Sequence, residues 1–263
     1  MSQKCRVLAV LWLLLAALAA CQEPPLNPAY RVATDATLAP MSFIDDGNRI
    51  AGFEVDLMQA LAEQAGFGYE LINVEWAGVI GGVITRKYDM AISSITILDE
   101  RKKKMAFTIP YLQSGLSIVV RRDTQGVRTL EDLAARNLKV GAQRGTTAYF
   151  FLEKHPRIRK VGYEQYGHAV ADLIKGEVDA VIGESTGTLY YKSHDNAIFE
   201  KIKMVGEILT EEHYGIIVHK DNPQLLAVLN RALAALLANG TVQTLHAKWD
   251  LGTAAAVPRP GRP

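Results

Sequence analysis

Hydroxyl and charged side chains gather in the segment Ser93–Arg101, whose sequence is SSITILDER. An apolar strand is expected over Asp89–Ser94, and a helix is expected to begin near Asp99. Ligands of open α/β sheets bind beyond the carboxyl ends of the strands, so these hydroxyls predict a polar pocket. Arg101 could present its planar guanidinium to a carboxylate there. The alternative is a solvent-exposed arginine beside Lys102–Lys104, since most arginines are exposed.

The segment Gly183–Gly187 (GESTG) allows two interpretations. It matches the G-x-S-x-G motif of serine hydrolases, and it follows an expected strand as that motif requires. However, no His-Gly-Gly oxyanion motif precedes the serine, and the strands group into two short sheets, which disfavours a hydrolase. The alternative assigns the chemistry to Glu184, a carboxylate at the end of a strand that would suit an ammonium group.

Further polar and aromatic residues follow other strands. The loop Gln143–Thr147 (QRGTT) precedes a helix, where backbone N–H groups bind anions, although a capped helix without a ligand explains it equally well. The loop lacks the Gly-Lys-Ser/Thr sequence of a nucleotide site. Asp35 and Trp76 should face the same edge as Ser93, although a lone tryptophan is more often a core residue. The six histidines show no metal-ligand spacing, so we expect no metal and no cofactor.

The composition excludes several classes of protein. The 263 residues are 49% hydrophobic and 22% charged, which is too apolar for a disordered chain. The 29 basic and 28 acidic residues nearly balance, whereas a nucleic-acid-binding surface needs a basic excess. Two cysteines can neither cross-link a fold of this size nor build a four-thiolate zinc site. We therefore expect a globular protein that binds no nucleic acid.

The two ends of the chain differ from its body. Residues 1–20 begin with basic side chains and continue as the apolar run Val7–Ala20. As a helix this run measures roughly 21 Å, too short for a hydrocarbon core of about 30 Å, so it predicts a signal peptide. It ends in Leu-Ala-Ala-Cys, which resembles a bacterial lipobox, so Cys21 is the expected lipidation site; an ordinary signal peptide is the alternative. Residues 21–29 are expected to be a linker and residues 253–263 a flexible tail, because each holds three prolines.

Between these ends, two runs of alternating strands and helices are expected, which implies parallel sheets flanked by helices. The expected strands are Tyr30–Asp35, Tyr69–Val74, Asp89–Ser94, Leu116–Arg121, Leu138–Ala142, Lys160–Glu164, Asp179–Glu184 and Tyr214–His219. The expected helices are Val55–Ala65, Trp76–Thr85, Thr129–Arg136, Thr147–His155, Ala169–Lys175, Ser185–Lys192, Pro223–Asn239 and a short one capped by Thr241. Two α/β lobes of about 100 residues each fit the length better than one barrel.

Several segments resemble the polar amino-acid-binding branch of the bacterial extracytoplasmic solute-binding proteins, family 3. They are Ala33–Asp35, Ala51–Leu57, Ser93–Arg101, Tyr111–Gly115, Val178–Glu184 and Asn239–Thr241. The resemblance implies an α/β, two-lobed periplasmic-binding-protein-like fold of type II, with a mostly parallel sheet flanked by helices in each lobe and a two-strand hinge. Residues 30–111 plus 214–252 would form lobe 1, and residues 112–213 lobe 2. Tyr111–Gly115 and Glu211–Gly215 would be the hinge.

The resemblance also implies a function. The lobes would close on a small-molecule amino acid, and the closed form would dock on the permease of an ABC transporter. The protein would be an extracytoplasmic monomer, anchored to the membrane through Cys21. Arg101 would bind the ligand α-carboxylate, and Glu184, where relatives usually have aspartate, the α-ammonium. The ligand-binding residues would be Asp35, Leu38, Trp76, Ser93, Ser94, Thr96, Arg101, Gln143, Thr146, Thr147 and Glu184.

The side-chain specificity follows from the same correspondence. Trp76 would form one aromatic wall, but Leu38 stands where many relatives have a second aromatic residue. Asp35 and Gln143 would flank the ligand side chain, and an acid there favours a cationic or amide-bearing group over an acidic one. We therefore expect arginine, lysine, ornithine or histidine first, and glutamine second.

One class of enzymes, the cyclohexadienyl (arogenate/prephenate) dehydratases, shares the fold of these binding proteins and resembles them. These enzymes carry an added acid about one helical turn after the strand that ends in the ammonium-binding carboxylate. Here Gly187 stands near that position, and glycine cannot donate a proton. We therefore expect a binding protein and not an enzyme.

Overall fold

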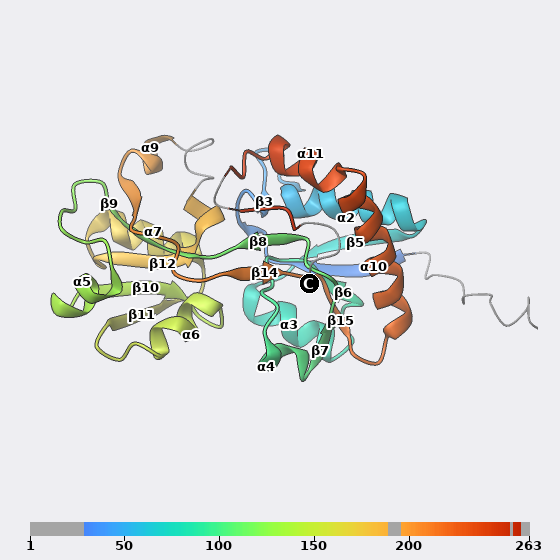
Figure 1. Cartoon of the computed structure of the whole chain (residues 1–263), viewed down its shortest axis with the longest axis horizontal. Helices are drawn as coiled ribbons and strands as arrows, with labels where there is room; N and C mark the ends of the chain where they lie inside the picture. Colours follow the sequence, from blue (N-terminus) through green and yellow to red (C-terminus); the bar gives the residue numbers. More distant parts are fainter. Residues whose placement is uncertain (1–28, 189–195, 253–254, 259–263) are drawn as a thin grey trace, which may run out of the picture.

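The computed structural model describes residues 29–188, 196–252 and 255–258, and these form two lobes (Figure 1). The sheet of lobe 1 has the strand order β5-β1-β6-β15-β7, and that of lobe 2 has the order β11-β10-β12-β9-β13. Strands β8 (Leu112–Ser114) and β14 (Glu212–Tyr214) pair antiparallel and run from one lobe to the other. We call β8 and β14 the crossing strands. The expected two-lobed α/β fold with a two-strand hinge is confirmed.

Lobe 1 combines an early and a late part of the chain. Its early elements are β1 (Ala29–Thr34), β2 (Thr37–Leu38), β3 (Ser42–Ile44), β4 (Ile50–Ala51), α2 (Phe53–Ala65), β5 (Gly68–Asn73), α3 (Trp76–Ile84), β6 (Met90–Ala91), α4 (Asp99–Lys102) and β7 (Met105–Phe107). Its late elements are β15 (Ile217–His219), α10 (Pro223–Ala238) and α11 (Thr241–Lys248). The short sheet β2-β3-β4 was not expected, because its strands are only two or three residues long.

Lobe 2 is formed by the chain between the crossing strands. Its elements are β9 (Leu116–Arg121), α5 (Leu130–Ala135), β10 (Lys139–Gln143), α6 (Thr147–Glu153), β11 (Arg159–Tyr163), α7 (Tyr166–Lys175), β12 (Ala180–Glu184), α9 (Asn196–Phe199) and β13 (Ile202–Val205). Residues 185–188 are helical, and the rest of the helix expected over Ser185–Lys192 lies outside the described residues. Helix α7 begins three residues before the expected Ala169, at Tyr166.

Both main sheets are mixed, although mostly parallel sheets were expected. Strand β1 lies parallel to β5 and β6, but β15 is antiparallel to β6 and to β7. In lobe 2, β10 lies parallel to β11 and β12, but β9 is antiparallel to β12 and to β13. The antiparallel strands β9 and β15 each follow a crossing strand, so they enter their sheets from the hinge side.

The helix ends agree with the sequence signals, with one exception. Helix α2 ends at Gly66, which adopts the left-handed conformation at φ 74°. Thr129 and Asp132 form a reciprocal capping box at α5. Thr241 is not the N-cap of α11: Gly240 occupies that position, and the Thr241 hydroxyl donates to the Asn239 side chain instead. The expected strand over Tyr214–His219 also divides, because its first residue belongs to β14 and its last three to β15.

Helices cover both faces of each sheet, so each lobe has its own hydrophobic core (Figure 1). In lobe 1, α2 and α10 pack with one face of the sheet, and α3 packs on the other. In lobe 2, α5 and α6 pack on one face, and α7 packs on the other. Leu38 in β2 contacts the core of each lobe, so apolar contact continues across the interface.

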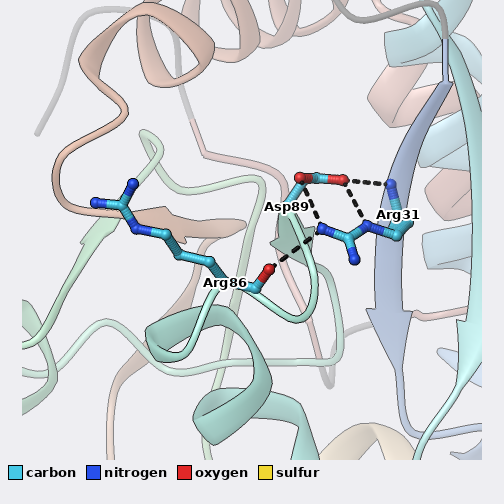
Figure 2. Close-up of polar contacts among 3 residues, drawn as sticks. All are labelled: Arg31, Arg86 and Asp89. Carbon is cyan, nitrogen blue, oxygen red and sulfur yellow. Dashed lines mark hydrogen bonds and ion pairs between the residues drawn. The ribbon is translucent and has the colours of Figure 1, made fainter.

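A polar network fixes the start of β1 beside β6 (Figure 2). The backbone N–H of Arg31 donates to Asp89 at 2.8 Å, and its guanidinium donates to the same carboxylate at 3.2 and 3.3 Å. The guanidinium also donates to the backbone carbonyl of Arg86 at 3.2 Å. Because the Arg31 side chain is about half exposed, this pair specifies the alignment of the strands more than it adds stability.

The chain near the C-terminus is packed at Ala255 and Ala256, where a flexible tail was expected. Ala255 is buried, and its carbonyl lies 2.9 Å from the His246 ring nitrogen Nε2. Ala256 exchanges two backbone hydrogen bonds with Gln113, at 2.7 and 2.8 Å, and so extends the crossing strands. The prolines of this segment all follow Ala256, so they leave its N–H and carbonyl available for this pairing.

Among the described residues, no single helix is long and apolar enough to cross a membrane. Helices α10 and α11 pass that test only as a pair, and they are bent by 73° where they meet.

The pairing at Ala256 gives a first prediction. Ala256→Pro removes the N–H that donates to Gln113, so we expect the free energy of unfolding to fall by about 1–2 kcal/mol. Urea unfolding followed by circular dichroism measures it. The control Ala256→Ser keeps the N–H and should stay near the wild type. Equal effects of proline and serine would contradict the pairing.

Candidate functional site

A concave pocket lies between the lobes, where small-molecule sites are commonly found. All eleven residues expected to bind a ligand line it: Asp35, Leu38, Trp76, Ser93, Ser94, Thr96, Arg101, Gln143, Thr146, Thr147 and Glu184. The lining also includes Ala148, Tyr166, Ile182 and Gly183, which were not expected. Residues of both lobes therefore meet there, as the family resemblance implied. Cys21, the expected lipidation site, lies outside the described residues.

Arg101 is a buried cation between the lobes. It lies in the short helix α4, and only 9% of it is exposed. Its guanidinium donates to the carbonyls of Thr96 in lobe 1 and Gly145 in lobe 2, at 3.1 and 3.3 Å, and lies over the Trp76 ring at 5.6 Å. Burial lowers the pKa of Arg101, and the negative charges of Glu212 and Glu184 oppose this shift. Within the described part of the chain, no carboxylate forms an ion pair with this side chain.

Glu54 holds Ser94 in place beside the cavity. The Ser94 N–H and hydroxyl donate to Glu54 Oε1, at 2.5 and 3.1 Å, and Tyr111 donates to the same oxygen. Ser94 has a φ of 48°, a conformation that costs energy in a non-glycine residue and is here held by these contacts. Glu54 belongs to the resembling segment Ala51–Leu57, but nothing in the sequence pattern indicated that it is buried.

The polar contacts of Asp35 span both lobes. The carboxylate accepts from Thr37 at 2.8 Å and from the Gln143 amide of lobe 2 at 3.5 Å. Its backbone N–H donates to the Ser93 hydroxyl at 3.0 Å. Burial raises the pKa of the Asp35 carboxyl, and the hydrogen bonds from Thr37 and Gln143 oppose this shift. A cation placed nearby would stabilise the charged form.

Glu184 ends β12 and projects toward the crossing strands. Tyr214 of β14 donates to one of its oxygens, and Thr147 lies 3.3 Å from the other. Burial raises the pKa of the Glu184 carboxyl well above its usual value, the charge of Glu212 raises it further, and Arg101 opposes the shift.

Thr146, in the loop Gln143–Thr147, caps α6 by accepting from the Tyr149 N–H at 3.4 Å. The loop Gln143–Thr147 therefore both caps the start of a helix and lines the cavity.

Tyr166 supplies an aromatic wall that the sequence analysis missed. Leu38 was expected to leave the aromatic sandwich incomplete, but Tyr166, the first residue of α7, lines the cavity from lobe 2. Its ring fills the space next to Gly183 and Gly187, where an added Cβ would lie 2.3 and 3.1 Å from ring carbons. In the sequence, Tyr166 stands out only as an aromatic residue at the start of a helix, and such residues are too common to indicate a binding site.

The environment of Ser185 contradicts a serine hydrolase. Ser185 is completely buried, and its Oγ lies 3.1 Å from the Ser114 hydroxyl. A nucleophile must be reachable by its substrate, so the G-x-S-x-G match has a structural origin. Within the described ranges, no group of three or more histidine, cysteine or acidic residues is placed to hold a metal ion.

Burial of Glu54 gives a second prediction. Its side chain is 1% exposed, and burial raises its pKa to about 7. The folded protein therefore keeps a proton that the unfolded chain loses above about pH 4.3, so its stability should fall as the pH rises toward 7. Between pH 5 and pH 8 we expect the wild type to lose about 2–3 kcal/mol relative to Glu54→Gln, measured by urea unfolding. Parallel pH profiles of the two proteins would contradict this.

Comparison with known proteins places these features in a family. Residues 30–253 match the family described as bacterial extracellular solute-binding proteins, family 3. The chain is 32% identical over 220 residues to ABC transporter arginine-binding protein 1 of Escherichia coli, a match covering 81% of this chain and 87% of that protein.

Two solved structures are similar throughout. An ancestral arginine-binding protein bound to arginine matches with a TM-score of 0.79 and 32% identity, over 86% of this chain and 99% of that one. An ancestral amino acid-binding protein, a precursor of cyclohexadienyl dehydratase, matches with a TM-score of 0.78 and 32% identity, over 84% and 95% of the two chains. From the family match, the sequence identity and the shared fold, this chain belongs to the bacterial extracellular solute-binding proteins of family 3.

Proposed function

We propose that this protein captures a basic L-amino acid between its lobes and delivers it to an ABC importer. One observation carries the choice of ligand: the charged residues lining the cavity are one cation, Arg101, and two carboxylates, Asp35 and Glu184. An amino acid with a neutral side chain has one cation, its α-ammonium, and could therefore pair with only one of these carboxylates. An amino acid with a cationic side chain matches both, and buried charges are tolerated when they are paired.

The ligand would lie with its α-carboxylate at Arg101 and its α-ammonium at Glu184. Its side chain would extend toward Asp35 and Gln143, along the aromatic rings of Trp76 and Tyr166. Ser94, Thr96 and Thr147 would add hydrogen bonds to the two α-groups. The family and the arginine-binding relative support this ligand class, because arginine carries the second cation that the Asp35 end requires.

Delivery would follow closure. Hydrogen bonds already join the lobes across the cavity, from Arg101 to Gly145 and from Gln143 to Asp35, so the closed arrangement presents one continuous surface to a permease. The protein would act outside the cytoplasm as a monomer, held at the membrane by lipid on Cys21. The family description supports the extracellular location.

A dehydratase activity has less support. The E. coli relative and the two similar structures are named as binding proteins, although one is a precursor of a dehydratase. Near the position of the added acid, Gly187 has no side chain, and a Cβ there would lie 3.1 Å from Tyr166 and 3.2 Å from Leu38. A proton-donating residue would need these neighbours to move.

Calorimetry with L-arginine tests the proposal. Arg101→Ala should weaken binding at least about tenfold, because the ligand carboxylate would be buried without its cation. The matched control is Arg144→Ala: Arg144 is also in the cavity-side loop, but its side chain is about half exposed and pairs with Glu164 on the surface. The control should bind like the wild type. Unchanged affinity in Arg101→Ala would contradict the assignment, and absence of wild-type binding to every basic amino acid would contradict the ligand class.

A further inference from the structure

Glu212 contacts the cavity wall from behind. It lies in the crossing strand β14, is 6% exposed, and does not itself line the cavity. A second hollow on its other side is lined by Thr96, Thr147, Thr210 and Glu212 among others. Thr96 and Thr147 line both spaces, so they form the wall between them, and the Glu212 carboxylate sits against that wall.

The hydrogen bonds of Glu212 are directed at threonine hydroxyls. Its Oε2 accepts from Thr96 at 2.6 Å and from Thr147 at 3.0 Å, and its Oε1 accepts from Thr210 at 3.1 Å. Thr96 belongs to lobe 1 and Thr147 to lobe 2, so a single oxygen atom from a crossing strand binds a hydroxyl of each lobe. This arrangement exists only while the lobes are together.

The direction of these bonds determines what the two hydroxyls can bind. A threonine hydroxyl has one proton to donate and two lone pairs that accept. Where the proton is given to Glu212, the oxygen can only accept from the cavity side. Thr147 also lies 3.3 Å from Glu184, but its single proton can serve one carboxylate, and Glu212 is nearer. Both threonine oxygens therefore favour N–H donors and disfavour a carboxylate.

The number of hydrogen-bond acceptors that these residues offer to the cavity matches a primary ammonium group. Thr96 Oγ1, Thr147 Oγ1 and the Glu184 carboxylate offer three acceptors, and a primary ammonium has three N–H donors. We infer that Glu212 is a positioning residue that orients the Thr96 and Thr147 hydroxyls to accept from the ligand α-ammonium. It does so without touching the ligand, and this inference rests on the proposed amino-acid ligand.

The test compares L-arginine with 5-guanidinopentanoic acid, the same molecule without its α-amino group. In Glu212→Met, which keeps the volume but removes both acceptor oxygens, arginine should bind at least about tenfold more weakly, the effect of one lost hydrogen bond to a charged group. The analogue should change by less than about threefold, because it never uses the oriented hydroxyls. Calorimetry measures both, and Glu212→Ala gives the same comparison if the methionine variant does not fold.

Two controls separate orientation from charge and from packing. Glu211→Gln removes the same charge from the adjacent residue, whose side chain is 70% exposed, and should leave both affinities unchanged. Glu212→Gln keeps a carbonyl oxygen that can take the two hydroxyl protons, so it should retain most of the preference for arginine over the analogue. Loss of that preference in Glu212→Gln would show that charge acts instead of orientation.

The remaining outcomes are also decisive. Equal weakening of arginine and its analogue in Glu212→Met would assign Glu212 a structural role and overturn the inference, as would no weakening of either. If the wild type binds a different amino acid, the same comparison uses that amino acid and its deaminated analogue. In that case the proposed ligand class fails while this inference remains under test.

Discussion

The burial of the Arg101 guanidinium between the lobes is the constraint on which the site depends. An isolated charge taken out of water is costly, so it needs hydrogen-bond acceptors and nearby negative charge. The protein supplies carbonyl oxygens from both lobes, the face of Trp76, and the charges of Glu212 and Glu184 at longer range. A bound carboxylate would complete this environment, so in the proposed function the cation would bind the anionic end of the ligand.

The crossing strands do more than join the lobes. Tyr111, next to β8, donates to Glu54, which holds Ser94 at the lobe 1 side of the cavity. Tyr214 of β14 donates to Glu184 at the lobe 2 side, and the two tyrosine rings lie 6.2 Å apart. Polar groups on both sides of the cavity are thus positioned by neighbouring residues of the same two strands. Because these strands also join the lobes, a rotation of one lobe about them would displace the polar groups that line the cavity.

Local signals in the sequence predicted the alternation of strands and helices, and strand ends and helix starts located Asp35, Arg101 and Glu184. The two-strand hinge and the remaining lining residues, such as Leu38, were implied by the family resemblance. Residues that act through tertiary contacts were missed: Tyr166 comes from a helix start, and Glu54 and Glu212 look like ordinary surface acids in the sequence. The pairing of Ala256 with Gln113 was missed for the same reason, since proline content describes local stiffness and not a distant partner.

The central claim is that Asp35 makes the cavity select a cationic side chain, and a ligand pair of nearly equal shape tests it most directly. Citrulline replaces the guanidinium of arginine by a neutral urea group. In calorimetry, the wild type should bind arginine at least about tenfold more tightly than citrulline, and Asp35→Asn should reduce this ratio of affinities to within about threefold. A preference that is the same in both proteins, or a wild type that binds citrulline as tightly as arginine, would contradict the account.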